Sequence, residues 1–325
     1  MSIIERSEYK PPFFASNGHV QTIYPTLLRR VNGVNYRRER LETPDGDFLD
    51  IDFSEIKSDK IAVISHGLEG NSYRAYVMGM VRCLNRYGWD VAAWNFRGCS
   101  GEINRKPKFY HGGATYDLDV VIKYLTENYN YRQIHLVGFS MGGNINLKYL
   151  NDYKNELPDT LRGTVSFSVP CDLASSAQKI STIAGGLYMK RFVKMLKDKM
   201  KAKSKLMPDQ IDTNGLDDIK TFEEFDNRYT APLHGFRDVE DYWEKASCKN
   251  LLSNIEVPSL IVNAKNDPFL TEFCFPIEQT RQNEYVHLEI PDNGGHVGFI
   301  RFADSGVYWS EKRAVEFLKE CGSRG

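Results

Sequence analysis

The residues GFSMGG, from Gly138 to Gly143, place a serine between glycines directly after the apolar run IHLV at 134–137. A continuous apolar run is typical of a strand buried in a parallel sheet, and the residues after Gly142 are spaced as in a helix. Where a strand turns straight into a helix, glycine leaves room that other residues do not. We therefore predict that Ser140 stands on a tight strand-to-helix turn, with its hydroxyl at the sheet edge near free backbone N–H groups.

Strand and helix patterns alternate on both sides of this turn. Strands are predicted at 61–64, 91–94, 134–139, 164–169, 259–263 and 286–290, helices at 76–88, 115–128, 142–153, 272–281 and 310–320, and a hairpin from strands 36–43 and 48–53. Because a parallel connection needs a crossover, this alternation predicts an α/β fold with a mostly parallel central sheet flanked by helices. The alternation stops between Pro170 and about Asn254, so we expect a core of residues 1–170 and 255–325 with an inserted helical cap of residues 171–254.

Composition narrows the class of protein. The 325 residues carry a net charge of −1 with an isoelectric point near 6.7, so the chain lacks the positive field with which nucleic-acid-binding proteins attract phosphate, and no nucleic acid partner is expected. Glu5, Glu8 and Lys10 interrupt the N-terminus where a signal peptide needs an unbroken apolar core. No run approaches the roughly 18 apolar residues of a membrane span. We therefore expect a cytoplasmic protein without a transmembrane segment; its oligomeric state stays open.

Neither a metal nor another cofactor is expected. The cysteines are scattered, without a C-x-x-C pair or the dense spacing of a disulfide framework or zinc site, so they are predicted to be reduced thiols. They are Cys83, Cys99, Cys171, Cys248, Cys274 and Cys321. No pair of histidines has metal-ligand spacing such as H-E-x-x-H.

A nucleophilic serine needs a histidine as base and an acid that orients it, here in the chain order serine, acid, histidine. Asp267 follows the predicted strand 259–263, and His296 follows the predicted strand 286–290. Both therefore lie in loops at the carboxyl ends of strands, the edge at which Ser140 emerges. Asp292 is a second candidate, but an Asp in a Pro-Asp-Asn turn more often forms the turn itself. We favour Asp267, because its loop directly follows a strand.

None of the remaining histidines is assigned a catalytic role, and His135 and His287, which lie within predicted strands, are expected to be structural. His66 and His111 lie in glycine loops, which a histidine commonly holds by hydrogen bonds, and the others have no catalytic spacing: His19, His135, His234 and His287. The loop HGLEG, which follows the predicted strand 61–64, is expected to supply one oxyanion donor, the backbone N–H of Leu68. The second donor is the N–H of the residue after the serine, Met141.

Five longer segments resemble the YheT-like branch of the α/β-hydrolases: PPFFASNGHVQTIYP, HGLEGNSYRAYV, WDVAAWNFRGCSGEINRKPKFYHGGATYDL, GFSMGGNINLKYL and FDNRYTAPLHGFRDVEDYW. This branch is also similar to plant embryogenesis-associated proteins and to membrane-bound animal lipases and esterases, and the resemblance runs from about Pro11 to Phe317. It implies a serine hydrolase of carboxylic esters with Ser140, Asp267 and His296 as its catalytic triad. The chain departs from the animal members in showing no N-terminal anchor.

Residues 188–207 (YMKRFVKMLKDKMKAKSKLM) contain eight Lys or Arg against one Asp. Apolar residues recur at three or four positions and predict a helix with one apolar and one cationic face; they are Met189, Phe192, Val193, Leu196, Met200 and Met207. Such a helix could lie on a membrane surface. We favour a cap helix with its apolar face on the body and its lysines in solvent, because the seven acidic residues of 209–226 can neutralise them. Peripheral membrane contact stays open.

Three functions remain open. The first is a serine esterase that forms an acyl-enzyme with a small ester substrate, in a pocket that adaptable methionines make tolerant of acyl chains. The second is a lipase or monoacylglycerol hydrolase that acts at a lipid interface. The third is a binding protein without catalytic activity, because a fold alone does not imply a reaction.

Overall fold

The structure is a computed structural model that describes residues 2–4, 6–302 and 306–323. Within these residues nine strands form one sheet, in the order β1-β9-β8-β7-β6-β4-β5-β3-β2. The strands are β1 (Ile3–Ile4), β2 (Arg37–Glu42), β3 (Phe48–Ser54), β4 (Lys60–Ser65), β5 (Asp90–Asn95), β6 (Gln133–Phe139), β7 (Leu161–Phe167), β8 (Ser259–Val262) and β9 (Val286–Glu289).

The sheet is mostly parallel, which confirms the fold class expected from the sequence. Strands β4 to β9 and the short β1 pair in parallel, whereas β3 runs antiparallel to both β5 and β2. The hairpin β2–β3 turns at 43–47, where the N–H of Thr43 donates a hydrogen bond to the carbonyl oxygen of Asp47. All the predicted strands are present, and β1 is an addition that a two-residue segment could not have indicated.

Helices cover both faces of the sheet. Strand β4 shows why: Ile61 and Val63 point into the core on one face, and Ala62 and Ile64 into the core on the other, as the two-residue period of a strand requires. Helices α3 (Thr115–Asn128) and α4 (Met141–Asp152) pack on the first face, and α2 (Ala75–Arg86) and α11 (Trp309–Gly322) on the second. A strand buried on both faces reads as a continuous apolar run.

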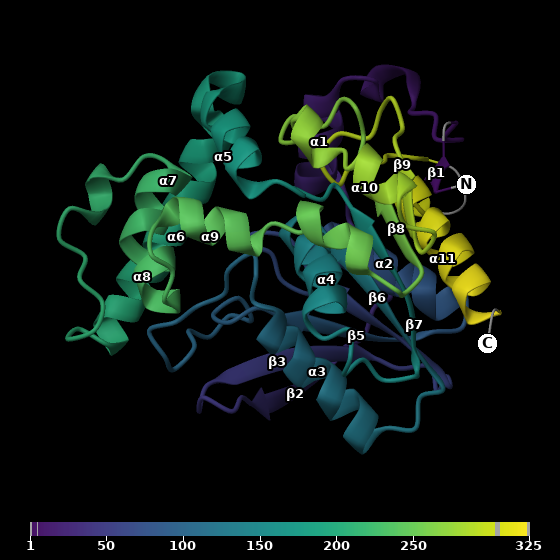
Figure 1. Cartoon of the computed structure of the whole chain (residues 1–325), viewed down its shortest axis with the longest axis horizontal. Helices are drawn as coiled ribbons and strands as arrows, with labels where there is room; N and C mark the ends of the chain where they lie inside the picture. The colour runs from purple at the N-terminus through teal and green to yellow at the C-terminus, as the bar shows by residue number, and fades with distance from the viewer. Residues whose placement is uncertain (1, 5, 303–305, 324–325) are drawn as a thin grey trace.

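Between β7 and β8 the chain forms a helical insert, which comprises α5 (Leu173–Thr182), α6 (Leu187–Leu206), α7 (Phe222–Phe225), α8 (Ala231–His234) and α9 (Val239–Ala246). Figure 1 shows these helices gathered at one side of the sheet, away from the two ends of the chain. The predicted amphipathic helix is α6, and its apolar residues are buried against the neighbouring insert helices. This confirms the packed arrangement that we favoured over a membrane-facing one.

Two lysines of α6 are buried, contrary to the expectation that the lysines lie in solvent. Lys199 and Lys203 are buried, with Lys199 Nζ bonded to Glu69 and Lys203 Nζ to Asn104. Lys201 does pair with Asp217 of the acidic segment, at 2.7 Å and near the surface. Two ammonium groups of the cationic face therefore fix α6 to the core, which periodicity alone could not show.

Helix α1 (Gly18–Leu28) was not predicted, because it begins with a glycine and contains Pro25. The side chain of Asn17 accepts hydrogen bonds from the N–H groups of His19 and Val20, and this cap starts the helix. The predicted helix 272–281 is wrong in extent, because Pro276 lacks an N–H and α10 (Ile277–Arg281) begins after it.

All six cysteines are buried and free. Across the described residues, we find no helix whose length and hydropathy would let it cross a bilayer.

Candidate active site

Ser140 stands on the turn between β6 and α4, with φ of 53° and ψ of −122°. Neighbouring backbone crowds this turn. A Cβ added to Gly138 would lie 2.4 Å from the Cα of Gly143, and one added to Gly142 would lie 2.3 Å from the carbonyl oxygen of Ser65. Glycine is therefore required on both sides of the serine, and a left-handed φ at the serine itself is held by this packing.

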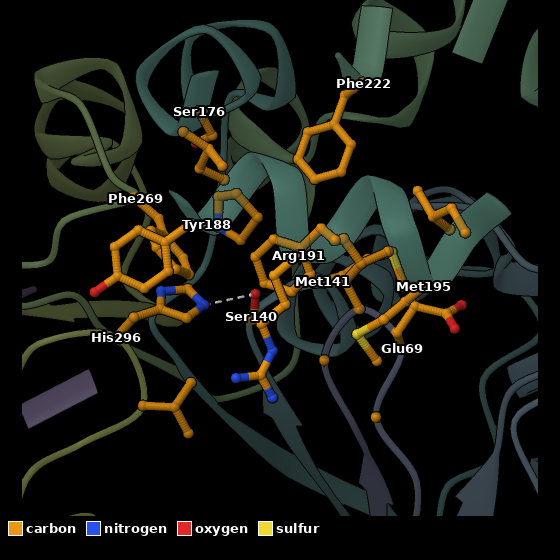
Figure 2. Close-up of a pocket in the computed structure, with 18 of the residues that line it drawn as sticks. Glu69, Ser140, Met141, Ser176, Tyr188, Arg191, Met195, Phe222, Phe269 and His296 are labelled. Carbon is orange, nitrogen blue, oxygen red and sulfur yellow. Dashed lines mark hydrogen bonds between the residues drawn. The ribbon is translucent and has the colours of Figure 1, made fainter. Parts of the chain in front are cut away.

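Ser140, His296 and Asp267 form one hydrogen-bonded chain. His296 Nε2 lies 2.9 Å from Ser140 Oγ, and His296 Nδ1 lies 2.9 Å from Asp267 Oδ2. Figure 2 shows His296 and Ser140 joined in this way among the residues that line a pocket. A carboxylate beside Nδ1 accepts a hydrogen bond, so Nδ1 carries the proton and Nε2 is free to accept one from the serine.

The structure separates the two candidate acids. Asp267 is buried, and its Oδ1 accepts a hydrogen bond from the N–H of Phe269 as well as contacting the imidazole. Asp292 is exposed and pairs with Lys265 at the surface, at 2.6 Å. Of the two, Asp267 is therefore the one that orients His296.

The loop that carries His296 is fixed by contacts from distant parts of the chain. Thr22 Oγ1 of α1 accepts a hydrogen bond from the N–H of His296, and Ser168 Oγ accepts one from the N–H of Val297, both at 2.9 Å. Gly295 has a φ of 57°, and a Cβ there would lie 2.5 Å from the carbonyl oxygen of Gly18. Helix α1 thus packs directly against the imidazole loop, a role that the sequence did not indicate.

Two backbone N–H groups are available next to Ser140. Those of Leu68 and Met141 donate to no acceptor among the residues that the structure describes. Met141 is the first residue of α4, where an N–H has no partner within the helix. Gly67 lies close enough to the serine that a Cβ on it would be 3.3 Å from the Cβ of Ser140. The loop 66–70 therefore borders the same small space as the start of α4.

The loop 66–70 is held by side chains that the sequence analysis missed. Glu69, whose φ is 51°, accepts hydrogen bonds from Tyr110 and from Lys199 of α6, each at 2.5 Å. Tyr110 in turn accepts a bond from the N–H of Glu69, and Tyr76 accepts one from the N–H of Gly67. The buried Lys199 joins the insert to this loop. The sequence did contain a signal for this contact: HGLEG carries a single carboxylate, and the segment 188–207 is rich in lysine.

The histidine of this loop has a structural role, as expected. His66 Nδ1 lies 2.7 Å from the carbonyl oxygen of Gly67, so it carries the proton, and Nε2 accepts a bond from the N–H of Phe96. Burial lowers the pKa of His66 to about 3, so the ring is neutral. His111 is also buried, and its Nδ1 accepts a bond from the N–H of Gly113. Neither ring contacts Ser140 by any hydrogen bond within the described chain.

The NFRGCSG segment, which contributes to the family resemblance, also has a structural role. Its Arg97 is buried, and the guanidinium binds Asp117 through Nη2 at 2.7 Å and through Nε at 2.9 Å. Nη1 of the same group binds Asp45 and Asp47 of the β2–β3 turn. This network ties the hairpin to α3.

The pocket above Ser140 is lined mainly by apolar side chains, which come from the core and from the insert. They include Leu68, Phe109, Met141, Ile180, Leu196, Phe222 and Phe269. Figure 2 shows Met195 and Phe222 of the insert around the same pocket as Ser140. The lining carboxylates are not free anions, because Glu69 is paired with Lys199 and burial raises the pKa of Asp226 to about 7. The pocket suits an apolar group.

Comparisons with known proteins agree with the α/β fold. A family profile described as "alpha/beta hydrolase fold" matches residues 63–181. The "Putative esterase YheT" of Escherichia coli (strain K12) is 33% identical over 300 residues, which cover 90% of this chain and 87% of that protein. "Phospholipase ABHD3" of Mus musculus is 28% identical, over 90% of this chain and 73% of its own. A Pyrococcus furiosus esterase structure superposes with a TM-score of 0.60 at 18% identity, covering 90% of this chain and 98% of that one; this likeness concerns the fold alone.

Proposed function

Because this chain belongs to the YheT-like branch of the α/β-hydrolases, whose relatives are esterases and lipases, we propose that it hydrolyses carboxylic esters through an acyl-enzyme on Ser140. The observation that supports the proposal is the hydrogen-bonded chain from Ser140 through His296 to Asp267, with 2.9 Å at both links. In this proposal the three residues are the catalytic triad.

The first half of the reaction forms the acyl-enzyme. Ser140 Oγ attacks the ester carbonyl while His296 Nε2 takes its proton. Asp267 accepts the Nδ1–H bond throughout and stabilises the imidazolium that results. His296 then gives the proton to the leaving alcohol, and the acyl group stays on Ser140.

The negative charge on the carbonyl oxygen needs donors at the same point. In the proposal these are the backbone N–H groups of Leu68 and Met141, which have no other acceptor in the described structure. Loss of one such donor typically costs about 2.7–4 kcal/mol of transition-state stabilisation. Both donors are main-chain groups, so their placement depends on the loop 66–70 and on the start of α4.

Water completes the cycle. His296 Nε2, neutral again after the alcohol leaves, takes a proton from a water molecule that attacks the acyl carbonyl. It then gives this proton to Ser140 Oγ as the bond between Oγ and the acyl carbon breaks, and the carboxylic acid is released. We regard the helical insert of residues 171–254 as the cap of this site. Its apolar side chains, among them Phe222 and Leu196, line the pocket, so the acyl portion of the ester would lie against them.

The test uses p-nitrophenyl esters from acetate to decanoate together with a fluorophosphonate probe. We expect wild-type protein to hydrolyse the esters and to carry the probe on Ser140, and Ser140→Ala to do neither. Ser176→Ala is the matched control, because Ser176 lines the same pocket and its hydroxyl contacts Cys274 instead of the triad. Hydrolysis by Ser140→Ala at the wild-type rate, or wild-type protein that takes up no probe, would favour the binding protein over the esterase.

A further inference from the structure

Helix α1 presents apolar side chains to solvent. Ile23, Leu27 and Leu28 are all exposed, and Leu28 keeps 62% of its accessible surface. The side of the helix opposite Ile23 and Leu27, with Gln21 and Pro25, is buried. Successive helical residues are about 100° apart, so Ile23 and Leu27, four residues apart, lie side by side. Leu28 lies about 100° further round the helix, with the half-buried Tyr24 between it and Leu27. A surface helix normally places its polar residues on its exposed side.

Aromatic side chains extend this exposed apolar surface. Phe14 packs against Tyr24 of α1 and stacks on Phe302, with ring centroids 6.2 Å and 5.7 Å apart. Phe13 contacts Phe14 edge-on and is 95% exposed. Phe14 and Phe302 are themselves exposed. We call the whole set the α1 apolar band: Phe13, Phe14, Ile23, Leu27, Leu28 and Phe302.

The α1 apolar band runs into the pocket above Ser140. Ile23 and Leu27 belong to both, since they are exposed to solvent and also line the pocket, beside Thr22 and Thr26. Thr22 is the residue that binds the N–H of His296. The band is therefore one border of the pocket mouth and is held rigidly to the imidazole loop.

Positively charged side chains lie next to the band. Residues 11–30 contain no Asp or Glu and end in Arg29 and Arg30, of which Arg30 is exposed. Arg191 of α6 also lines the pocket and is exposed, and it makes no ion pair or hydrogen bond with any residue that the structure describes. Figure 2 shows it beside the same pocket as Ser140. Apolar side chains bordered by unpaired cations match the surface of an anionic lipid layer.

A lipid surface also fits better than a second protein. A protein partner that covered the band would close the pocket mouth at Ile23 and Leu27, whereas a lipid layer is itself a source of apolar esters. The amphipathic helix α6 is not an alternative docking element, because the residues of its apolar face, such as Val193 and Met200, are packed inside the insert.

From the band, its charges and its position we infer that the α1 apolar band is a docking site for an anionic lipid surface, through which long-chain esters pass directly into the pocket. The aromatic rings of Phe13, Phe14 and Phe302 enter the layer, and Arg30 and Arg191 contact its headgroups. Hydrolysis of the ester in the pocket rests on the proposed function, whereas docking to the lipid surface does not depend on it.

The experiment combines vesicle flotation with two substrates. Wild-type protein is expected to float with vesicles of equal phosphatidylglycerol and phosphatidylcholine, and much less with phosphatidylcholine alone or at high salt. Phe13→Ser/Leu28→Ser should lower the bound fraction roughly tenfold, since two large side chains leave an apolar contact. Hydrolysis of p-nitrophenyl palmitate in the same vesicles should fall in parallel, while hydrolysis of dissolved p-nitrophenyl butyrate stays unchanged, because neither residue lines the pocket.

Leu206→Ser is the matched control, since Leu206 is 64% exposed at the C-terminal end of α6 and lines no part of the pocket; it should behave as wild type. Wild-type protein that stays unbound, or a Phe13→Ser/Leu28→Ser variant that floats equally well, would overturn the inference. A wild-type dimer in gel filtration that this variant dissociates would assign the band to a second copy of the chain instead. Flotation without hydrolysis of dissolved p-nitrophenyl butyrate would contradict the proposed function and leave the docking site standing.

Discussion

Replacing Lys199 by methionine tests whether the insert holds the loop 66–70 through one buried ion pair. Lys199 Nζ lies 2.5 Å from Glu69 Oε1, and the two side chains are only 4% and 9% exposed. Methionine keeps the apolar stem and removes the charge, so the carboxylate stays buried with Tyr110 as its hydrogen-bond donor. Removing one partner of a buried pair typically costs about 3–5 kcal/mol. We expect a loss near the lower limit, because Tyr110 remains.

The same change should reduce turnover, because Leu68, the proposed oxyanion donor, directly precedes Glu69. If the released loop withdraws that N–H completely, kcat falls by about 10²–10³, the usual effect of one lost donor. A partial shift gives a smaller decrease in kcat. Because Leu68 of this loop also lines the pocket, KM for a short ester should rise as well if the loop withdraws.

Urea unfolding gives the stability and p-nitrophenyl butyrate hydrolysis gives kcat. Lys194→Met is the matched control: Lys194 lies on the same helix and pairs with Asp198, but the two side chains are 74% and 56% exposed, and such a pair contributes about 0–1 kcal/mol. Glu69→Gln/Lys199→Met, which removes both charges, should recover much of the stability. The reasoning is refuted if Lys199→Met and Lys194→Met unfold at the same urea concentration with unchanged kcat.

The remaining predictions concern the acid, the turn and the pH dependence of stability. Asp267→Asn should lower kcat about 10⁴-fold, since the imidazole loses the acceptor that fixes its tautomer, whereas Asp292→Asn should match wild type in the same ester assay; equal losses would mean that the acid is misassigned. Gly142→Ala should yield no folded protein by circular dichroism, because its Cβ would lie 2.3 Å from a backbone oxygen, and a native thermal transition would contradict the packing described for this turn. Burial lowers the pKa of His135 to about 3, so below about pH 6.5 the unfolded chain binds a proton there that the native state does not, and stability is lost as the pH falls. Urea unfolding at about pH 8 and pH 5 should therefore show wild type losing about 2 kcal/mol more than His135→Gln, and identical losses would show that His135 is protonated in the native state.

Local patterns were sufficient for the core of the fold. The apolar runs that form β4 to β8 are buried on both faces, so each of these strands was visible in its own residues without knowledge of its neighbours. The need for glycine at 138 is equally local in cause, because Gly143 of the same turn crowds it, whereas Gly142 is crowded by Ser65 at the end of the distant strand β4. Parallel strands then place their carboxyl-end loops at one edge, which was enough to name Asp267 and His296 as candidates.

Elements with conflicting local signals were missed or misjudged. Helix α1 contains Pro25 and begins at Gly18, and it is stable because its buried side packs on the imidazole loop. The predicted helix 272–281 was misjudged although the sequence contained the reason: Pro276 lacks an N–H, and α10 begins after it. Lys199 and Lys203 are buried although lysines are normally exposed. Their burial depends on Glu69 and Asn104, which bind the two ammonium groups and lie far away in the sequence.

By itself, then, the sequence determined the α/β order, the position of Ser140 on its turn and the short set of residues that could assist it. The tertiary structure alone decided that Asp267 and not Asp292 meets the imidazole, that Glu69 meets Lys199, and that residues of α1 line the pocket. The physical reason is distance along the chain. Periodicity reports how one element is buried, but a contact such as that of Thr22 with His296, 274 residues apart, exists only once the whole sheet has brought both ends of the chain to the same edge.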